Sequence, residues 1–181
     1  MSAHDGDSGM TSHPHDGRVS KAASVIDTLG EIDELNAVVG LLLACLPLSC
    51  TDMKSMLANI QKTLFCVGSC ESGLDVEKQG ARVSAALPDL ERALQAFDEE
   101  TGPLAHFIIP GGHPAACTAQ VARTVGRRAE RAVVAMADQQ AEARSAARLA
   151  SIAYLNRLST FLFALARVIN KREGFTEAQP L

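Results

Sequence analysis

Apolar side chains recur at helical spacing over long stretches of this chain, and this periodicity constrains its fold more than any other feature. In the last stretch, from about Arg144 to Lys171, Leu, Ile, Val and Phe fall mostly three or four positions apart. That spacing puts them on one face of an α-helix. The same pattern predicts further helices over about Ala23–Leu46, Asp52–Cys70 and Pro114–Ala137, and a shorter one over about Pro88–Glu100.

The segments between these stretches carry turn and breaker residues. We interpret Glu71–Ser84 as a mixed connector and Gln139–Ala143 as a short break, and we expect Pro47 to end the first helix. No alternation of apolar and polar residues typical of a strand is present. Aromatic residues make up only 4% of the chain, so Leu and Ala must supply most of the core. The sequence therefore predicts an all-α fold, an antiparallel bundle of four or five helices.

The charge balance limits the partners that the chain can have. A net charge of −4 and a pI near 5.7 argue against general nucleic-acid binding. The longest uninterrupted apolar run, Ala37–Leu46, is too short to cross a membrane. The five cysteines are odd in number and show no Cys-x-x-Cys spacing, which is typical of reduced thiols. We expect a cytoplasmic protein that binds neither nucleic acid nor a membrane.

One predicted helix carries four arginines and a glutamate close together. Arg123, Arg127, Glu130 and Arg131 follow one another at helical spacing, so they share one face. Arginines held at fixed spacing suit the bidentate recognition of phosphate or carboxylate. The alternative is a solvated helix face on which Glu130 pairs with Arg127.

Polar residues interrupt the apolar strips of two other helices. Asp33 and Asn36 do so in the first helix, and Asn156 begins a polar segment in the last. Burial of an unpaired carboxylate is costly, so a semi-buried Asp33 requires a cationic partner, which the arginine face can provide. The alternative for Asp33 is a structural buried pair between helices. Taken together, the polar residues favour one convergent polar pocket.

Two segments outside the helices complete the organisation of the chain. Residues 1–17 are polar and glycine-rich, and we expect them to be flexible. After Phe107, a Pro-Gly-Gly sequence predicts a turn, and Pro114 suits the first turn of the helix that follows. We divide the chain into an N-terminal arm (1–22), a helical bundle (23–175) and a C-terminal tail (176–181).

Short motifs along most of the chain resemble, in family order, those of the propanediol-utilisation type of ATP:cob(I)alamin adenosyltransferase. Each motif alone is weak, but the ordered set is highly specific. The motifs are Gly6-Asp7-Ser8-Gly9-Met10-Thr11, Gly17-Arg18-Val19-Ser20-Lys21, Asp33-Glu34-Leu35-Asn36, Ile60-Gln61 with Leu64-Phe65, Phe107-Ile108-Ile109-Pro110-Gly111-Gly112, the arginine stretch, and Tyr154-Leu155-Asn156-Arg157-Leu158-Ser159.

The resemblance implies a homotrimer of helical bundles with active sites between adjacent subunits. It implies transfer of the 5′-deoxyadenosyl group of ATP to the cobalt of cob(I)alamin, which gives adenosylcobalamin and triphosphate. It also implies Mg²⁺, a flavin-type reductase and an adenosylcobalamin-dependent enzyme as partners. It assigns Asp33, Phe107 and Arg123 to the corrinoid, and these form the expected catalytic set with Arg127. The residues that it assigns to ATP are Gly6, Asp7, Gly9, Thr11, Arg18, Lys21, Arg127, Glu130 and Asn156.

Elementary chemistry agrees with these implied roles. The cobalt is itself the nucleophile, so the protein has only to align C5′ of ATP with it and stabilise the leaving triphosphate. Phosphate oxygens would supply most of the Mg²⁺ ligands. Phe107 would keep water and the base away from the lower face of the cobalt. The alternative for Phe107 is an ordinary core aromatic residue.

The chain departs from the family pattern at several positions. They include residues Ala3–Asp5 of the arm, Gln120, Gly126, Thr160, and His113 where a helix-capping serine is expected. These changes leave the expected catalytic set intact and alter the nucleotide side. They favour, as an alternative, a non-catalytic corrinoid-binding or cofactor-delivery protein on the same scaffold. A metal–carboxylate bundle would require inward Glu-x-x-His pairs, which the sequence lacks.

Overall fold

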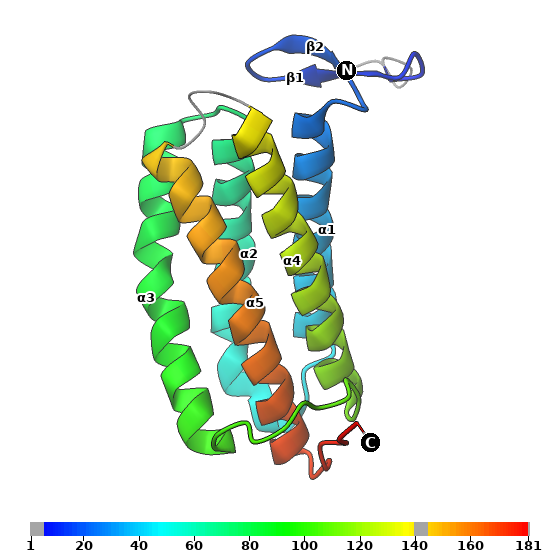
Figure 1. Ribbon diagram of the computed structural model, residues 1–181, viewed down its shortest axis with the longest axis vertical. Helices are drawn as coiled ribbons and strands as arrows, with labels where there is room; N and C mark the ends of the chain where they lie inside the picture. Colours follow the sequence, from blue (N-terminus) through cyan, green and yellow to red (C-terminus); the bar gives the residue numbers. More distant parts are fainter. Residues whose placement is uncertain (1–5, 140–144, 181) are drawn as a thin grey trace.

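A computed structural model describes residues 6–139 and 145–180 of the chain (Figure 1). Five long helices stand side by side, and a short 3₁₀ helix, η1 (Leu48–Met53), leads from the first into the second. The long helices are α1 (Ser24–Ala44), α2 (Lys54–Glu71), α3 (Val76–Thr101), α4 (Pro114–Gln139) and α5 (Ala146–Arg172). The predicted all-α bundle is confirmed.

The helices form a ring in which each packs mainly against two neighbours, in the order α1, α2, α3, α5, α4 and back to α1. Neighbours in the ring are antiparallel except α3 and α5, which run in the same direction (Figure 1). Leu35, Leu64, Leu158 and Phe161 are among the side chains that fill its centre. In α5 the largely apolar sequence is long enough to span a membrane, but much of it is buried inside the bundle, as expected of a core helix.

Four of the predicted helices lie within about two residues of their observed bounds, because their apolar periodicity continues to each end. Ser145 caps α5, since its side-chain oxygen accepts a hydrogen bond from the Arg148 amide. The predicted break at Gln139–Ala143 falls largely outside the described residues, which resume at Ser145.

The predicted connector Glu71–Ser84 was wrong. A single helix, α3, covers most of it and all of the predicted helix Pro88–Glu100, which therefore begins earlier than expected, and only a short turn follows α2. Pro88 lies inside α3 on its exposed side, while Val83, Leu90 and Phe97 continue one buried strip past it. Gly80 lies within the segment that was expected to be a connector. It is a packing residue instead, since a Cβ atom there would lie only 2.5 Å from the Ala147 side chain of α5.

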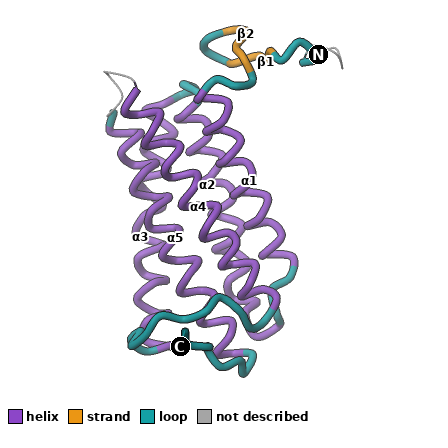
Figure 2. The backbone as a smooth tube through the Cα atoms, turned by 45° about the vertical axis from the view of Figure 1, so that its right-hand side comes forward, coloured by secondary structure: helices purple, strands orange, loops and turns teal. Residues whose placement is uncertain are grey.

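The expectation that the chain contains no strand was also wrong. Part of the N-terminal arm forms an antiparallel hairpin of β1 (Met10–His13) and β2 (Gly17–Ser20), which stands beyond the N-terminal end of α1 (Figure 2). Gly17 at the turn has φ +71°, a conformation that glycine adopts without strain. Each strand is only four residues long, too short for an alternating pattern to be recognised in the sequence.

Candidate active site

The arginine face predicted from the sequence lies on α4. Arg123 is half-buried and Arg127 is exposed, and no ion pair joins either of them to an acid in residues 6–139 and 145–180. Burial lowers the pKa of the Arg123 guanidinium below its usual range, and the positive charge of Arg127 lowers it further. The predicted alternative, an Arg127–Glu130 pair, is therefore not formed in this part of the chain. Two neighbouring cations without a counter-charge make this face suited to an anion.

Arg128 belongs to a different flank of α4. Its guanidinium pairs with Glu34 of α1 and lies 2.5 Å from the Glu31 carboxylate. These contacts tie α4 to α1 and use the charge of Arg128 within the bundle. Arg128 thus links α4 to α1, whereas the charges of Arg123 and Arg127 remain available for a ligand.

Gln120 is a residue of this face that sequence reasoning did not assign to the site. It is buried one turn before Arg123, and its Oε1 accepts a 2.7 Å hydrogen bond from Arg123 Nε. The contact fixes the orientation of the half-buried guanidinium without neutralising it. The sequence did contain a signal for this contact, since Gln120 lies one helical turn before Arg123 on the flank of the buried strip.

Asn156 lies on α5, the neighbour of α4 in the ring, and its side chain is exposed. The next residue, Arg157, pairs with Glu91 of α3 at 3.2 Å. Because successive helix residues are turned by about 100°, Asn156 lies on the α4 side of the exposed strip of α5. The hydroxyls of Ser159 and Thr160 both donate to the Asn156 carbonyl within α5. Ser159 and Thr160 therefore use their hydroxyls within α5, whereas Asn156 lies on the side of α5 that is nearer to the arginine face.

Asp33 does not have the environment that the sequence predicted. It is exposed on α1, and no ion pair involves it among the described residues. It borders a cavity of about 300 Å³ between α1 and α2, together with the exposed ring of Phe65. The prediction of a semi-buried carboxylate with a cationic partner is wrong for the single chain, since α1 turns Asp33 outward. Arg123 does not border this cavity.

Asn36, the other polar interruption of α1, has a structural role. Its side-chain Nδ2 donates to the Gln61 carbonyl of α2 at 3.4 Å, and Gln61 Nε2 donates to the Asn36 carbonyl at 3.2 Å. These two reciprocal hydrogen bonds link α1 and α2. The polar residues of the first and last helices therefore do not converge on one pocket within a single chain.

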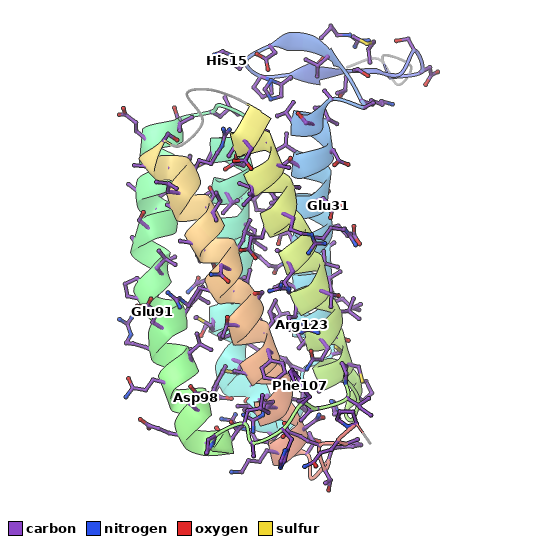
Figure 3. The ribbon with its side chains drawn as sticks, viewed as in Figure 1. His15, Glu31, Glu91, Asp98, Phe107 and Arg123 are labelled. Atoms are coloured by element: carbon purple, nitrogen blue, oxygen red, sulfur yellow. The ribbon has the colours of Figure 1, made fainter. Side chains whose placement is uncertain are left out.

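Phe107 lies in the loop between α3 and α4, with 85% of its surface exposed (Figure 3). The alternative of a core aromatic residue is wrong. The loop ends at His113, whose Nδ1 accepts a 3.1 Å hydrogen bond from the Ala115 amide in the first turn of α4. His113 thus caps the helix where the family pattern has serine. The exposed ring of Phe107 therefore lies in a loop whose C-terminal end, at His113, is held by hydrogen bonds.

The hairpin brings together residues of the predicted ATP-binding arm that are far apart in the sequence. The Lys21 amide donates to the Gly9 carbonyl at 2.8 Å. Lys21 Nζ lies so close to Gly6 that a Cβ atom there would meet it at 2.9 Å. Thr11 is half-buried on β1, whereas Asp7 and Arg18 are exposed. The glycine-rich backbone and a lysine ammonium therefore share one small region, as phosphate binding requires.

The arm and the Phe107 loop lie at opposite ends of the bundle (Figure 3). A helix as long as α4 spans about 39 Å. Groups that bind two reacting substrates must act within a few ångströms of each other. The arm and Phe107 of one chain therefore cannot serve the same pair of substrates in this arrangement.

Comparisons with known proteins agree with the fold. Residues 1–169 match the family model described as cobalamin adenosyltransferase. The chain is 36% identical over 165 residues to a corrinoid adenosyltransferase of Bacillus subtilis, covering 90% of this chain and 83% of that protein. It is 38% identical over 169 residues to a cobalamin adenosyltransferase of Cupriavidus metallidurans, covering 93% of this chain and 87% of that protein.

Solved structures give the same result. A variant PduO-type ATP:corrinoid adenosyltransferase from Lactobacillus reuteri, complexed with cobalamin and ATP, superposes with a TM-score of 0.85 at 26% identity, covering 98% of this chain and 97% of that one. The five-helix bundle and these matches thus define the class, and the chain belongs to the cobalamin adenosyltransferase family. Within that class it is an enzyme, a corrinoid adenosyltransferase of the kind that uses ATP.

Proposed function

We propose that this enzyme transfers the 5′-deoxyadenosyl group of ATP to the cobalt of cob(I)alamin in an active site shared by adjacent subunits of a homotrimer. The observation that carries the proposal is the pair of arginines on α4, Arg123 and Arg127, whose charges no acid neutralises within the described chain. The solved relative from Lactobacillus reuteri binds the two substrates that such a reaction needs.

The nucleotide side of the site would combine the arm with the α4–α5 face. Amide groups of the arm and Lys21 would bind the triphosphate, and Arg127 would neutralise charge as it develops on the leaving group. Asn156 supplies an amide, and Glu130 a carboxylate, for the ribose or the base. Because Arg127 is exposed and carries no internal ion pair in the described chain, it can turn toward a phosphate without breaking another contact.

The chemical step itself requires no protein nucleophile. Co(I) attacks C5′ of ATP, a cobalt–carbon bond forms, and the C5′–oxygen bond breaks with its electron pair leaving on triphosphate. The metal is formally oxidised from Co(I) to Co(III). The contribution of the chain is to align the two substrates and to exclude water.

The corrinoid side would be formed by Phe107, Asp33 and Arg123. The exposed ring of Phe107 would occupy the lower face of the corrin, so that water and the base do not coordinate the cobalt. Four-coordinate Co(II) is then easier to reduce. Asp33 and Arg123 are both accessible and unpaired with each other within one chain, so each is available at a contact between subunits.

Because the arm and Phe107 lie at opposite ends of each bundle (Figure 3), a site that uses both must draw them from different subunits. With three copies, the arm of one subunit can reach the α4 face of the next. Exposed apolar side chains, including Leu41, Phe65 and Val121, offer surface for such contacts. Light scattering at micromolar concentration should give three times the mass of one chain, and a monomer would contradict the proposal.

Mg²⁺ would be bound mainly by the triphosphate. Among the described residues, no group of three or more His, Cys, Asp or Glu side chains could hold a metal ion. Phosphate oxygens and water would supply most of its ligands, which Mg²⁺ accepts readily. When bound, the ion would neutralise phosphate charge. In the cell we expect a cytoplasmic enzyme, a flavin-type reductase to supply Co(I), and an adenosylcobalamin-dependent enzyme to receive the product.

The visible spectrum of Co(II)balamin mixed with the protein and ATP tests the proposal. We expect a shift to the four-coordinate species, then adenosylcobalamin and equimolar triphosphate after reduction. Arg92→Ala, on the exposed side of α3, serves as a matched arginine control. A spectral shift without product would instead support the non-catalytic corrinoid-binding alternative. Absence of both would contradict the proposed function.

A further inference from the structure

A buried side chain of α5, Asn170, attaches the C-terminal end of the Phe107 loop to the bundle. Asn170 is only 7% exposed, and both ends of its amide are used. Its Oδ1 accepts a hydrogen bond from the His113 amide at 2.9 Å, and its Nδ2 donates to the Gly111 carbonyl at 2.9 Å. One amide side chain therefore satisfies two backbone groups on either side of Gly112.

Gly112 shows how closely the loop fits this side chain. Its φ of +99° belongs to the left-handed region, where glycine is favoured. A Cβ atom at this position would lie 2.2 Å from Asn170 Oδ1, far inside contact distance. The loop thus approaches α5 at a point where only a residue without a side chain fits.

Arg167 holds the other end of the same loop. It lies one turn before Asn170, is also buried, and donates from its guanidinium to the Gly102 carbonyl at 3.2 Å. The same guanidinium pairs with Glu177 at 2.9 Å. Phe107 therefore lies between two anchors on one helix, while its own ring makes little contact with the protein. Together with the hydrogen bond from the Ile109 amide to the Ala178 carbonyl at 2.7 Å, these anchors limit where the backbone can place the ring.

We propose that Asn170 is a positioning residue for Phe107: its amide fixes the Pro110-Gly111-Gly112 turn so that the ring is presented to the corrinoid in one orientation. This inference rests on the role of Phe107 in the proposed function. Without the amide, the His113 N–H and the Gly111 carbonyl lose their partners, and the turn can adopt other conformations. Phe107 would then occupy the lower face of the cobalt for only part of the time.

Asn170→Ala tests the inference, with Asn59→Ala on the exposed side of α2 as the matched control. With Co(II)balamin, ATP and a mild reductant, we expect the rate to fall about tenfold. With chemically pre-reduced Co(I), the fall should stay below about twofold, because alignment on the ATP side is untouched. The KM for ATP should not change, and the four-coordinate Co(II) signal should fall in parallel with the rate.

A purely structural role would give a different result. Equal losses with Co(II) and Co(I), or an undiminished four-coordinate signal, would overturn the inference. Asn170→Asp provides a second variant if the alanine variant does not fold, since it keeps the acceptor for His113 and replaces only the donor to Gly111. It should show the same Co(II)-selective loss, and a rate equal to that of the unaltered enzyme would contradict the proposal.

Phe107→Ala, measured alongside, separates this inference from the function on which it rests. If Phe107→Ala abolishes the four-coordinate signal and Asn170→Ala does not reduce it, only the positioning role fails. If Phe107→Ala leaves the signal intact, the proposed role of Phe107 fails, and the positioning role fails with it.

Discussion

Replacement of Arg148 by Met should destabilise the protein strongly, because it would leave a buried carboxylate without its partner. Arg148 Nε of α5 lies 2.9 Å from Glu71 Oε2 at the end of α2, and the Glu71 side chain is 0% exposed. Its second oxygen, Oε1, is buried and has no hydrogen-bond partner among residues 6–139 and 145–180. Removing one member of such a pair costs about 3–5 kcal/mol. For a chain of this length, that corresponds to a fall in Tm of roughly 6–20 °C.

The loss should depend on pH, and its sign follows from the pKa of Glu71. Burial raises the pKa of this carboxyl above its usual range, and the charge of Arg148 only partly offsets the effect. The folded state therefore binds the proton more tightly than the unfolded state, so stability falls as pH rises through the raised pKa. Without Arg148 the pKa of Glu71 rises further. The variant should consequently be less destabilised at pH 5 than at pH 8.

Urea unfolding at the two pH values measures both effects. Arg92→Met is the control, because Arg92 and its partner Asp89 are both largely exposed, and loss of such a pair costs less than about 1 kcal/mol. Adding Glu71→Leu to Arg148→Met should recover most of the stability, since it removes the stranded carboxylate. If Arg148→Met lowered the free energy of unfolding no more than Arg92→Met at either pH, Arg148 would not be the partner that compensates the buried Glu71 carboxylate.

Three further predictions concern the proposed active site. Phe107→Ala should change Tm by less than about 2 °C, because the ring is 85% exposed, and it should lower activity far more with Co(II) and a mild reductant than with pre-reduced Co(I). Arg127→Ala should lower kcat/KM for ATP by about 30- to 1,000-fold, as expected for loss of a charge-assisted contact to phosphate, whereas Arg92→Ala should have no effect; a change below about threefold would contradict the assignment. In a double-mutant cycle, Asp33→Ala and Arg123→Ala should each be harmful and together less than additive, since the two residues would pair between subunits; additive losses would separate their roles.

The family motifs were recognisable because chemistry requires particular residues at particular spacings. Arg123 and Arg127 lie one turn apart on α4, as the helical period predicted. Local composition was less reliable for element bounds. The expected connector Glu71–Ser84 lies largely inside α3, and so does Pro88, where the short helix was expected to begin, because the buried strip of α3 continues past both.

The sequence by itself determined the all-α bundle, four of its helices and the family, since apolar periodicity and ordered motifs are properties of the chain alone. Tertiary structure decided which face each polar residue occupies. It turned Asp33 outward, assigned Arg128 to a contact with α1, and exposed Phe107 rather than burying it. It also placed Asn170, a polar residue near the end of the buried face of α5, within hydrogen-bond distance of the Phe107 loop. These outcomes depend on contacts between segments far apart in the chain, and spacing within one helix carries no information about them.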